Sequence, residues 1–245
     1  MPSRGRSCDL PRDVVELLKS RVLALQDWIE WEYTHGEWVE LDFRLRNVSW
    51  NFKDVISWPL DAFCVYHDAH QSCYLGSLKA VTALSDIEGI YGEKMNCVVS
   101  MCGGPEMETG GAPDWSNYMT ALGVNHHFQL HIDDRVARSA EDFHAFGHSC
   151  LRAWSSVYER VHAVQKQLEA TGQRLVVLFH CLGGVNRGPR ALLAWLIACG
   201  ATTEEAFGML LTQRKGLRPM LRRSYALFSL CQWENMKGHV YTIPF

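Results

Sequence analysis

Hydrophobic positions along most of the chain follow two alternating patterns. From residue 63 onward, short apolar runs alternate with stretches in which apolar residues recur every three or four positions. The short runs are typical of buried strands, and the longer stretches are typical of helices with one apolar face. Strands that alternate with helices predict an α/β fold in which a central, mostly parallel sheet is flanked by helices.

The individual elements can be placed from their patterns and end signals. Strands are predicted at 65–66, 73–75, 97–101, 128–132 and 175–179. Helices are predicted over 80–91, along 143–164 with a stop at Gly172, around 192–197 with a stop at Gly200, from the capping box of Thr202 and Glu205 to near Gly216, and from Pro219 onward. The segment 103–113, rich in glycine and acidic residues, is predicted to be a surface loop.

A separate helical pattern precedes this domain. Asp9 can cap a helix whose apolar positions extend to Ile29, and Gly36 can end it. We therefore expect residues 1–60 to form a helical N-terminal extension that docks on a main domain spanning residues 61–245.

Composition narrows the classes of function. The formal net charge is −3 and the pI is near 6.4, which argues against a general binder of nucleic acid or of membrane surfaces.

The nine cysteines lack paired short spacings, so reduced thiols in a cytoplasmic protein are expected. Cys97 and Cys102 bracket an apolar strand, which disfavours a zinc site, and neither a metal nor another cofactor is expected. No apolar run approaches the roughly 18 residues that cross a bilayer, so no membrane association is expected.

One stretch carries a candidate for chemistry. In "VVLFHCLGGVNRGPRALLAW", residues 176–195, Cys181 ends an apolar strand and stands six positions before Arg187, at the start of a helix. Gly183 and Gly184 let the backbone curl so that its N–H groups can face an anion, and the helix dipole adds a positive potential. This combination predicts a phosphate-binding loop.

The side chains at the two ends of the loop suit phosphoryl transfer. A helix N-terminus and a neighbouring cation favour the thiolate form of Cys181, which is the nucleophilic form. Arg187 offers a planar guanidinium that can hold two phosphoryl oxygens and stabilise a trigonal transition state. A cysteine at a strand end is often inert core, and a Gly-Gly pair is often only a turn, but the combination at this spacing favours a catalytic loop.

At these residues the sequence resembles the cysteine-based protein tyrosine phosphatases, and in particular the dual-specificity phosphatase family, whose signature is H-C-x5-R. His180, Cys181 and Arg187 match that signature. Two further segments are similar to family motifs. "CYLGSLKAV" at 73–81 resembles the strand that opens many such domains, and "LRPMLRRSYALF" at 217–228 resembles the turn and final helix that close them.

The resemblance covers about residues 64–240 and implies a fold, an activity and a set of site residues. The implied fold is the α/β fold of the protein tyrosine phosphatases. The implied activity is hydrolysis of phosphotyrosine, extended by a shallow pocket to phosphoserine and phosphothreonine, through a thiophosphoryl-cysteine intermediate. Cys181 would be the nucleophile, and His180 would support the loop by hydrogen bonding. The implied phosphate-binding loop consists of Leu182, Gly183, Gly184, Val185, Asn186, Arg187 and Gly188.

Such an enzyme also needs a carboxylic acid to protonate the leaving oxygen. In the family this acid follows a strand with alternating apolar residues. "LHIDD" at 130–134 fits that pattern and places Asp134 at the acid position, with Asp133 as the reserve. Asp134 lies 47 residues before Cys181, a longer interval than in compact family members, so an insertion is expected around 135–150. An Asp pair after a strand also often caps a helix, and that alternative stays open.

Two features of the loop refine this picture. The family usually has Ser or Thr directly after the Arg, and its hydroxyl helps the thiolate to leave, whereas here the residue is Gly188. The resemblance then implies slow breakdown of the phosphoenzyme, or a hydrogen-bond donor supplied by the substrate or by a water.

Residues 182–186 contain no Lys or Arg, which favours a phosphoprotein over an inositol phospholipid as the substrate.

Two other functions stay open. The first is a phosphoprotein-binding module with little catalysis, and Gly188 is the only feature that favours it. The second is an RNA 5′-triphosphatase, because related enzymes share the C-x5-R loop and some have Asn before the Arg, as Asn186 stands here. The acidic pI disfavours this second alternative.

Overall fold

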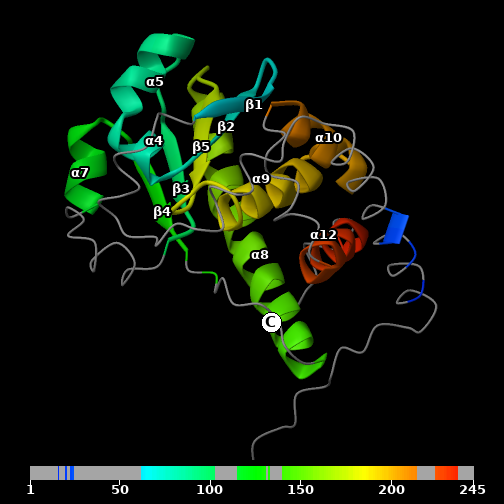
Figure 1. Cartoon of the computed structure of the whole chain (residues 1–245). Coiled ribbons are helices and arrows are strands. Elements are labelled where there is room, and N and C mark those ends of the chain that lie inside the picture. The colour runs from blue at the N-terminus through cyan, green and yellow to red at the C-terminus, as the bar shows by residue number, and fades with distance from the viewer. Residues whose placement is uncertain are drawn as a thin grey trace, which may run out of the picture.

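In the part of the chain that the structure describes, five strands form one mixed sheet in the order β1-β2-β5-β3-β4 (Figure 1). The computed structural model describes residues 62–102, 115–130, 132, 140–213 and 224–236, together with residues 16, 20, 23 and 24. The strands are β1 (Phe63–His67), β2 (Gln71–Gly76), β3 (Cys97–Ser100), β4 (His126–Gln129) and β5 (Leu175–His180).

The sheet is mostly parallel. Among the described strands, β2, β5, β3 and β4 run parallel to one another, and the edge strand β1 pairs with β2 in the antiparallel direction. The central strand β5 has the sequence LVVLFH, and all six of its residues are buried. A strand that is covered on both faces needs such a continuous apolar run rather than an alternating one. The predicted α/β fold, with a mostly parallel sheet flanked by helices, is confirmed.

Helices cover both faces of this sheet. Within the described part of the chain they are α4 (Leu78–Thr82), α5 (Leu84–Tyr91), α7 (Trp115–Ala121), α8 (Ala140–Ala170), α9 (Arg187–Ala198), α10 (Thr203–Gln213) and α12 (Ser224–Met236). Helices α8 and α9 pack on one face of the sheet, and α12 packs against both of them. Helix α4 packs on the other face, on the side where α5 and α7 lie (Figure 1).

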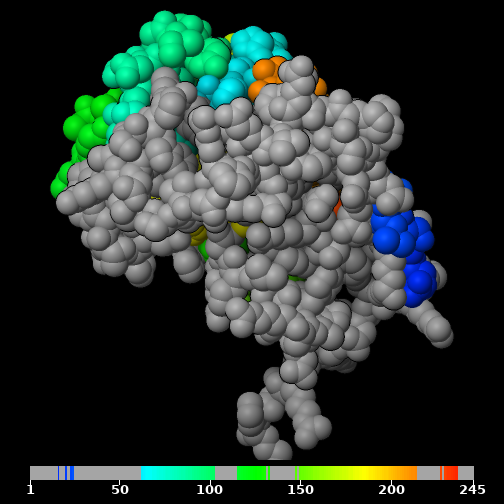
Figure 2. Space-filling view, viewed as in Figure 1, coloured from blue at the N-terminus to red at the C-terminus, as the bar shows by residue number. Residues whose placement is uncertain are grey.

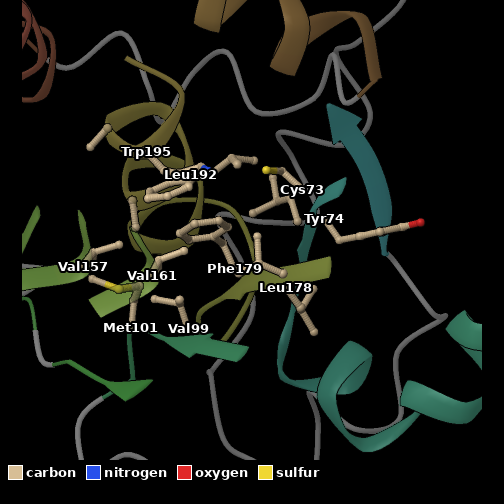
Figure 3. Close-up of a cluster of buried hydrophobic side chains, with 14 of the residues drawn as sticks. Cys73, Tyr74, Val99, Met101, Val157, Val161, Leu178, Phe179, Leu192 and Trp195 are labelled. Atoms are coloured by element: carbon tan, nitrogen blue, oxygen red, sulfur yellow. The ribbon is translucent and has the colours of Figure 1, made fainter. Parts of the chain in front are cut away.

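The side chains of β5 point alternately into the two layers. Phe179 points toward Leu192 and Trp195 of α9, whereas Leu178 points to the opposite side of the sheet (Figure 3). This alternation is expected because successive residues of a strand face opposite sides. It places His180, the last residue of β5, on the same side as Leu178.

The prediction of one helix over 80–91 is wrong. The segment forms two helices separated at Ala83, whose φ of −124° and ψ of 34° lie outside the helical region. The buried positions recur every three residues, at Leu78, Val81, Leu84 and Ile87. In one continuous helix such positions would shift around the axis by about 60° per step, so Leu78 and Ile87 would face opposite sides. The break allows both to be buried.

The strand predicted at 128–132 lies earlier in the chain. β4 spans His126–Gln129 and pairs residue by residue with β3, as far as Ser100 opposite Gln129. One further hydrogen bond, from the Leu130 N–H to the Ser100 carbonyl at 2.8 Å, continues the ladder. The length of the partner strand therefore sets the bounds of β4, which its own apolar run does not reveal.

Other helix predictions are confirmed. The long helix α8 covers 31 residues and takes up part of the segment where an insertion is expected. The capping box of α10 is reciprocal: the Thr202 N–H donates to Glu205 Oε2 at 2.7 Å, and the Glu205 N–H donates to Thr202 Oγ1 at 3.1 Å. Residues 16, 20, 23 and 24, which are the described residues of the segment 1–60, are helical, and the docked N-terminal extension stays a prediction.

Several predicted segments lie outside the described residues. They are the rest of 1–60, the loop 103–113, and the end of one helix and start of the next between Gly216 and Pro219. Among the helices that the structure does describe, none is both long and apolar enough to cross a membrane.

Candidate functional site

The loop singled out from the sequence lies at the carboxyl ends of the parallel strands. Cys181 directly follows β5, which ends at His180, and α9 begins at Arg187. Strands β2 and β3 end at the same level, because Gly76 and Ser100 are both paired with His180. In open α/β sheets, ligands bind at this edge. The loop therefore occupies the strand-to-helix junction that the sequence predicts.

Two main-chain hydrogen bonds connect the loop region to neighbouring elements. On one side, the Met101 N–H after β3 donates to the His180 carbonyl at 2.9 Å. On the other side, the N–H of Leu78, the first residue of α4, donates to the Leu182 carbonyl at 3.1 Å. The main chain on either side of Cys181 is thus held by β3 and by α4.

The predicted nucleophile and the predicted phosphate-binding arginine are both buried. Cys181 is 2 % exposed and Arg187 is 4 % exposed. The residues from Gly183 to Gly188 are also buried, and Leu182 is half-buried. Because a charge interacts more strongly with a ligand when water is excluded, the guanidinium of Arg187 can contribute more to binding an anion here than it could on the surface.

The backbone of the loop has the curl that an anion-binding loop requires. Gly184 adopts a φ of +64°, in the left-handed region that glycine adopts readily. Asn186 occupies the N-cap position of α9, and its side chain makes no capping hydrogen bond to this helix. An anion in the loop could accept hydrogen bonds from the N–H groups at that helix end.

Gly188, in the first turn of α9, packs against the start of the loop. A Cβ atom at residue 188 would lie 3.1 Å from the carbonyl carbon of His180 and 3.2 Å from the nitrogen of Cys181. Both distances are shorter than ordinary van der Waals contact, so any side chain would displace this main chain. Gly188, where the resembled family has Ser or Thr, therefore allows α9 to begin close to Cys181.

His180 is neutral at physiological pH. Its pKa is lowered to about 3, mainly because the imidazole is fully buried; His127 and Arg187 contribute to the lowering, whereas a hydrogen bond with the Cys181 main chain opposes it. An imidazole with so low a pKa is poorly matched to proton transfer at neutral pH. The supporting role expected for His180 fits this better than a role in acid–base chemistry.

Two residues that the sequence analysis did not single out lie on the same side of the sheet as His180. Ser100 is fully buried and lies opposite His180 on β3. His127 on β4 is paired with Val98, and burial lowers its pKa. The only sequence signal for Ser100 is a polar residue within the apolar run "CVVSM", and His127 has no comparable signal.

The predicted acid falls in a part of the chain that the structure does not describe. Asp134 and its reserve Asp133 lie outside the described residues, although Ile132, which directly precedes the pair, is buried. The assignment of Asp134 as the general acid stays a prediction.

A separate cleft lies along the edge strand β1. It has a volume of 390 Å³ and is lined by Cys64, Val65, Tyr66, His67, Tyr91 and Gln213. In the space-filling view, α5, β1 and α10 lie side by side at the top of the molecule (Figure 2). The cleft contains none of the residues of the loop.

Among the described residues, no group of three or more His, Cys, Asp or Glu side chains could hold a metal ion.

Comparison with known proteins gives matches only to solved structures. No family model matches the chain, and no curated protein matches it. One similar structure is that of the kinase associated phosphatase (KAP) with its catalytic-site cysteine replaced by serine. The TM-score is 0.48 at 12% identity, and the match covers 77% of this chain and 99% of that chain.

Two further structures show a similar level of resemblance. PTPMT1 in complex with PI(5)P has a TM-score of 0.46 at 20% identity, over 73% of this chain and 97% of that chain. Human DUSP28 has a TM-score of 0.43 at 17% identity, over 73% of this chain and 95% of that chain. Each is a protein that this chain resembles in overall structure at low sequence identity.

Proposed function

We propose that the chain is a cysteine-dependent phosphatase that hydrolyses phosphoric monoesters. The observation that carries this proposal is the loop from Cys181 to Arg187, which joins a buried parallel strand to a helix and has both terminal side chains buried. A thiol and a guanidinium at the two ends of one anion-binding loop suit the transfer of a phosphoryl group to sulfur.

The proposed reaction has two steps. The thiolate of Cys181 attacks phosphorus in line with the leaving oxygen, so that a sulfur–phosphorus bond forms while the ester P–O bond breaks, and Asp134 donates a proton to the leaving oxygen. Water then attacks the phosphorus, Asp134 accepts the proton of that water, and the sulfur–phosphorus bond breaks to regenerate the thiolate. Arg187 binds the phosphoryl oxygens in both steps.

Phosphoproteins are the proposed substrates. Residues 182–186 carry no Lys or Arg, so the loop lacks the extra positive charge that a substrate with several phosphates would require. Phosphotyrosine is the first candidate, and phosphoserine and phosphothreonine are the next.

We place the activity in the cytoplasm, because the nine cysteines lack the paired spacings of a disulfide framework.

A panel of phosphorylated compounds tests both the activity and the substrate class. The panel contains p-nitrophenyl phosphate, a phosphotyrosine peptide, the matched phosphoserine peptide, a soluble inositol phosphate and a 5′-triphosphate RNA. We expect hydrolysis of the first two, with the highest kcat/KM for the phosphotyrosine peptide. Phosphate release from the RNA alone would replace the proposal with a 5′-triphosphatase. Binding of the peptides without hydrolysis of any compound would make the chain a phosphoprotein-binding module.

Asp134→Asn and Asp133→Asn form a matched pair that tests the general acid. Phenyl phosphate is the suitable substrate, because its poor leaving group depends on protonation. Loss of a general acid costs about 10²–10⁴-fold in rate, so Asp134→Asn should lower kcat by at least that lower factor, and Asp133→Asn should change it little. The reverse pattern would assign the role to Asp133, and small effects in both variants would contradict either assignment.

A further inference from the structure

We infer that Ser100 is a positioning residue for the phosphate loop, and that it acts through a buried polar cluster formed by Ser100, His127 and His180 and completed by bound water. The inference rests on the proposed function in one respect, namely that the loop from Cys181 to Arg187 binds phosphate. It assigns a role to a strand residue that lies 81 positions before the nucleophile in the sequence.

The three side chains lie on one side of the sheet, beneath the start of the loop. Ser100 pairs with His180 across adjacent parallel strands, whose spacing is about 4.8 Å. His127 lies one strand further along, level with Val98 and Leu178. Paired residues of parallel strands face the same side, and this is the side toward which Leu178 points (Figure 3). His127 is also one of the groups that lower the pKa of His180.

Four polar atoms of this cluster are buried, namely Ser100 Oγ, His127 Nε2 and both ring nitrogens of His180. They make no well-formed hydrogen bond, either with one another or elsewhere in the described chain, although the main chain of Cys181 interacts with the His180 imidazole. A buried polar group without a partner costs about 1–3 kcal/mol, and proteins commonly satisfy such groups with a buried water that makes about three hydrogen bonds. Three such side chains on one side of the sheet supply the polar surroundings that a buried water requires.

The protonation states fit this arrangement. Both imidazoles have lowered pKa values and are neutral at physiological pH. A neutral imidazole has one N–H donor and one acceptor nitrogen, while a hydroxyl and a water can each donate and accept. A bound water that bonds to the hydroxyl of Ser100 can therefore also serve His180 as a donor or as an acceptor, without burying any charge.

The cluster is directly connected to the nucleophile through the main chain. His180 immediately precedes Cys181, and its carbonyl accepts a hydrogen bond from Met101, the residue that follows Ser100. A fixed His180 imidazole would hold this strand end in place. If the imidazole could rotate, the peptide that carries Cys181 would be free to shift relative to Arg187, which weakens phosphate binding and slows the attack.

Ser100→Ala tests the inference, and Ser72→Ala is its matched control. Both serines are fully buried in strands. Ser72 is paired with Val176, four residues before His180 and so roughly 13 Å along the strand. The Ser72 hydroxyl accepts a hydrogen bond from Arg174 at 2.8 Å, so its removal also destabilises the sheet. Three quantities are measured on the full chain: the Kd of inorganic phosphate, kcat/KM for p-nitrophenyl phosphate, and the solvent exchange of imidazole N–H protons by ¹⁵N NMR.

The expected result separates positioning from general stability. Because small misplacements of reacting groups are costly, Ser100→Ala should weaken phosphate binding and lower kcat/KM, each by about tenfold, while Ser72→Ala stays within about twofold of the native protein in both. The His180 imidazole is identified in the spectrum as the one that stays neutral down to pH 4. Its N–H should exchange slowly with solvent in the native protein and in Ser72→Ala, and much faster in Ser100→Ala.

The outcomes also separate this inference from the proposed function. Equal effects of Ser100→Ala and Ser72→Ala on phosphate affinity, or an unchanged exchange rate of the neutral imidazole in Ser100→Ala, would overturn the positioning role. Failure of the native protein to hydrolyse any phosphoester would contradict the phosphatase proposal alone, since phosphate affinity and imidazole exchange would still decide the role of Ser100.

Discussion

Gly188 lies against Cys181 so closely that a Cβ at residue 188 would be 3.2 Å from the Cys181 nitrogen. The residue type at 188 thus affects two properties of the loop. Its lack of a side chain lets the first turn of α9 approach the nucleophile, and its lack of a hydroxyl removes a group that the resembled family uses to assist the departure of the thiolate.

Gly188→Ala should lower activity through this contact. The added methyl would push the main chain at His180 and Cys181 by a few tenths of an ångström, and overpacking of this kind costs about 1–3 kcal/mol of stability. We expect kcat/KM for p-nitrophenyl phosphate to fall by about tenfold. Gly208→Ala on α10 is the control, because a Cβ there meets nothing within 4 Å. It should keep full activity, and equal activities of the two variants would show that the close approach does not matter.

The missing hydroxyl at 188 predicts that the second chemical step is slow. Rapid-quench kinetics with p-nitrophenyl phosphate should show a burst of nitrophenol close to one equivalent per protein, followed by a slower steady state. The reason is that the thiolate of Cys181 leaves without help from a neighbouring hydroxyl. Linear product formation from the first turnover would mean that both steps are matched in rate or that the first is limiting.

The cap of α4 should influence the loop, because Leu78 of this helix donates a hydrogen bond to Leu182. The buried Ser77 hydroxyl caps α4 by accepting from the Lys79 N–H at 3.1 Å. Ser77→Ala should lower the free energy of unfolding by about 1 kcal/mol and weaken phosphate binding several-fold.

Thr202→Ala removes a comparable cap from α10, where the Thr202 Oγ1 accepts from the Glu205 N–H. It should lower the free energy of unfolding by a similar amount, about 1 kcal/mol, and leave phosphate binding unchanged. If both variants weakened phosphate binding equally, the contact between α4 and the loop would have no special role.

The buried imidazole of His180 predicts a pH dependence of stability. Its pKa is lowered to about 3 in the folded protein, whereas an unfolded histidine takes up a proton below about pH 6.5. The unfolded chain therefore binds the extra proton between these values, so stability is present above pH 6.5 and is lost as the pH falls toward 3.

Denaturant unfolding of the native protein and of His180→Gln measures this contribution. At about 1.4 kcal/mol per pH unit, the native protein should lose about 2 kcal/mol more than the variant between pH 6.5 and pH 5. Parallel curves for the two proteins would show that His180 is not held neutral in the folded state.

The sequence predicts the centre of the fold better than its periphery. The apolar run at 175–179 predicts a buried strand, and the cysteine and arginine after it locate the loop and the start of α9. The break at Ala83 could not be predicted, because the helical period of 80–91 is continuous in the sequence. The need for a break follows only from the burial of both Leu78 and Ile87 in the structure.

Properties that depend on pairing between distant segments could not be predicted. The bounds of β4 follow from the length of β3, and the polar side chains on the same side of the sheet as His180 come from strands about 50 and 80 residues earlier in the chain. Ser100 becomes a candidate only when its register opposite His180 is known. The close approach of Gly188 to Cys181 likewise depends on how α9 packs on β5, which no local pattern encodes.

The nucleophilic role of Cys181 is tested by comparing the native protein with Cys181→Ser in the hydrolysis of p-nitrophenyl phosphate and in the binding of inorganic phosphate. We expect the native protein to turn over, whereas the variant should show no burst and no steady-state turnover but should still bind phosphate, because Arg187 and the loop remain. Turnover retained in Cys181→Ser would mean that Cys181 is not the nucleophile.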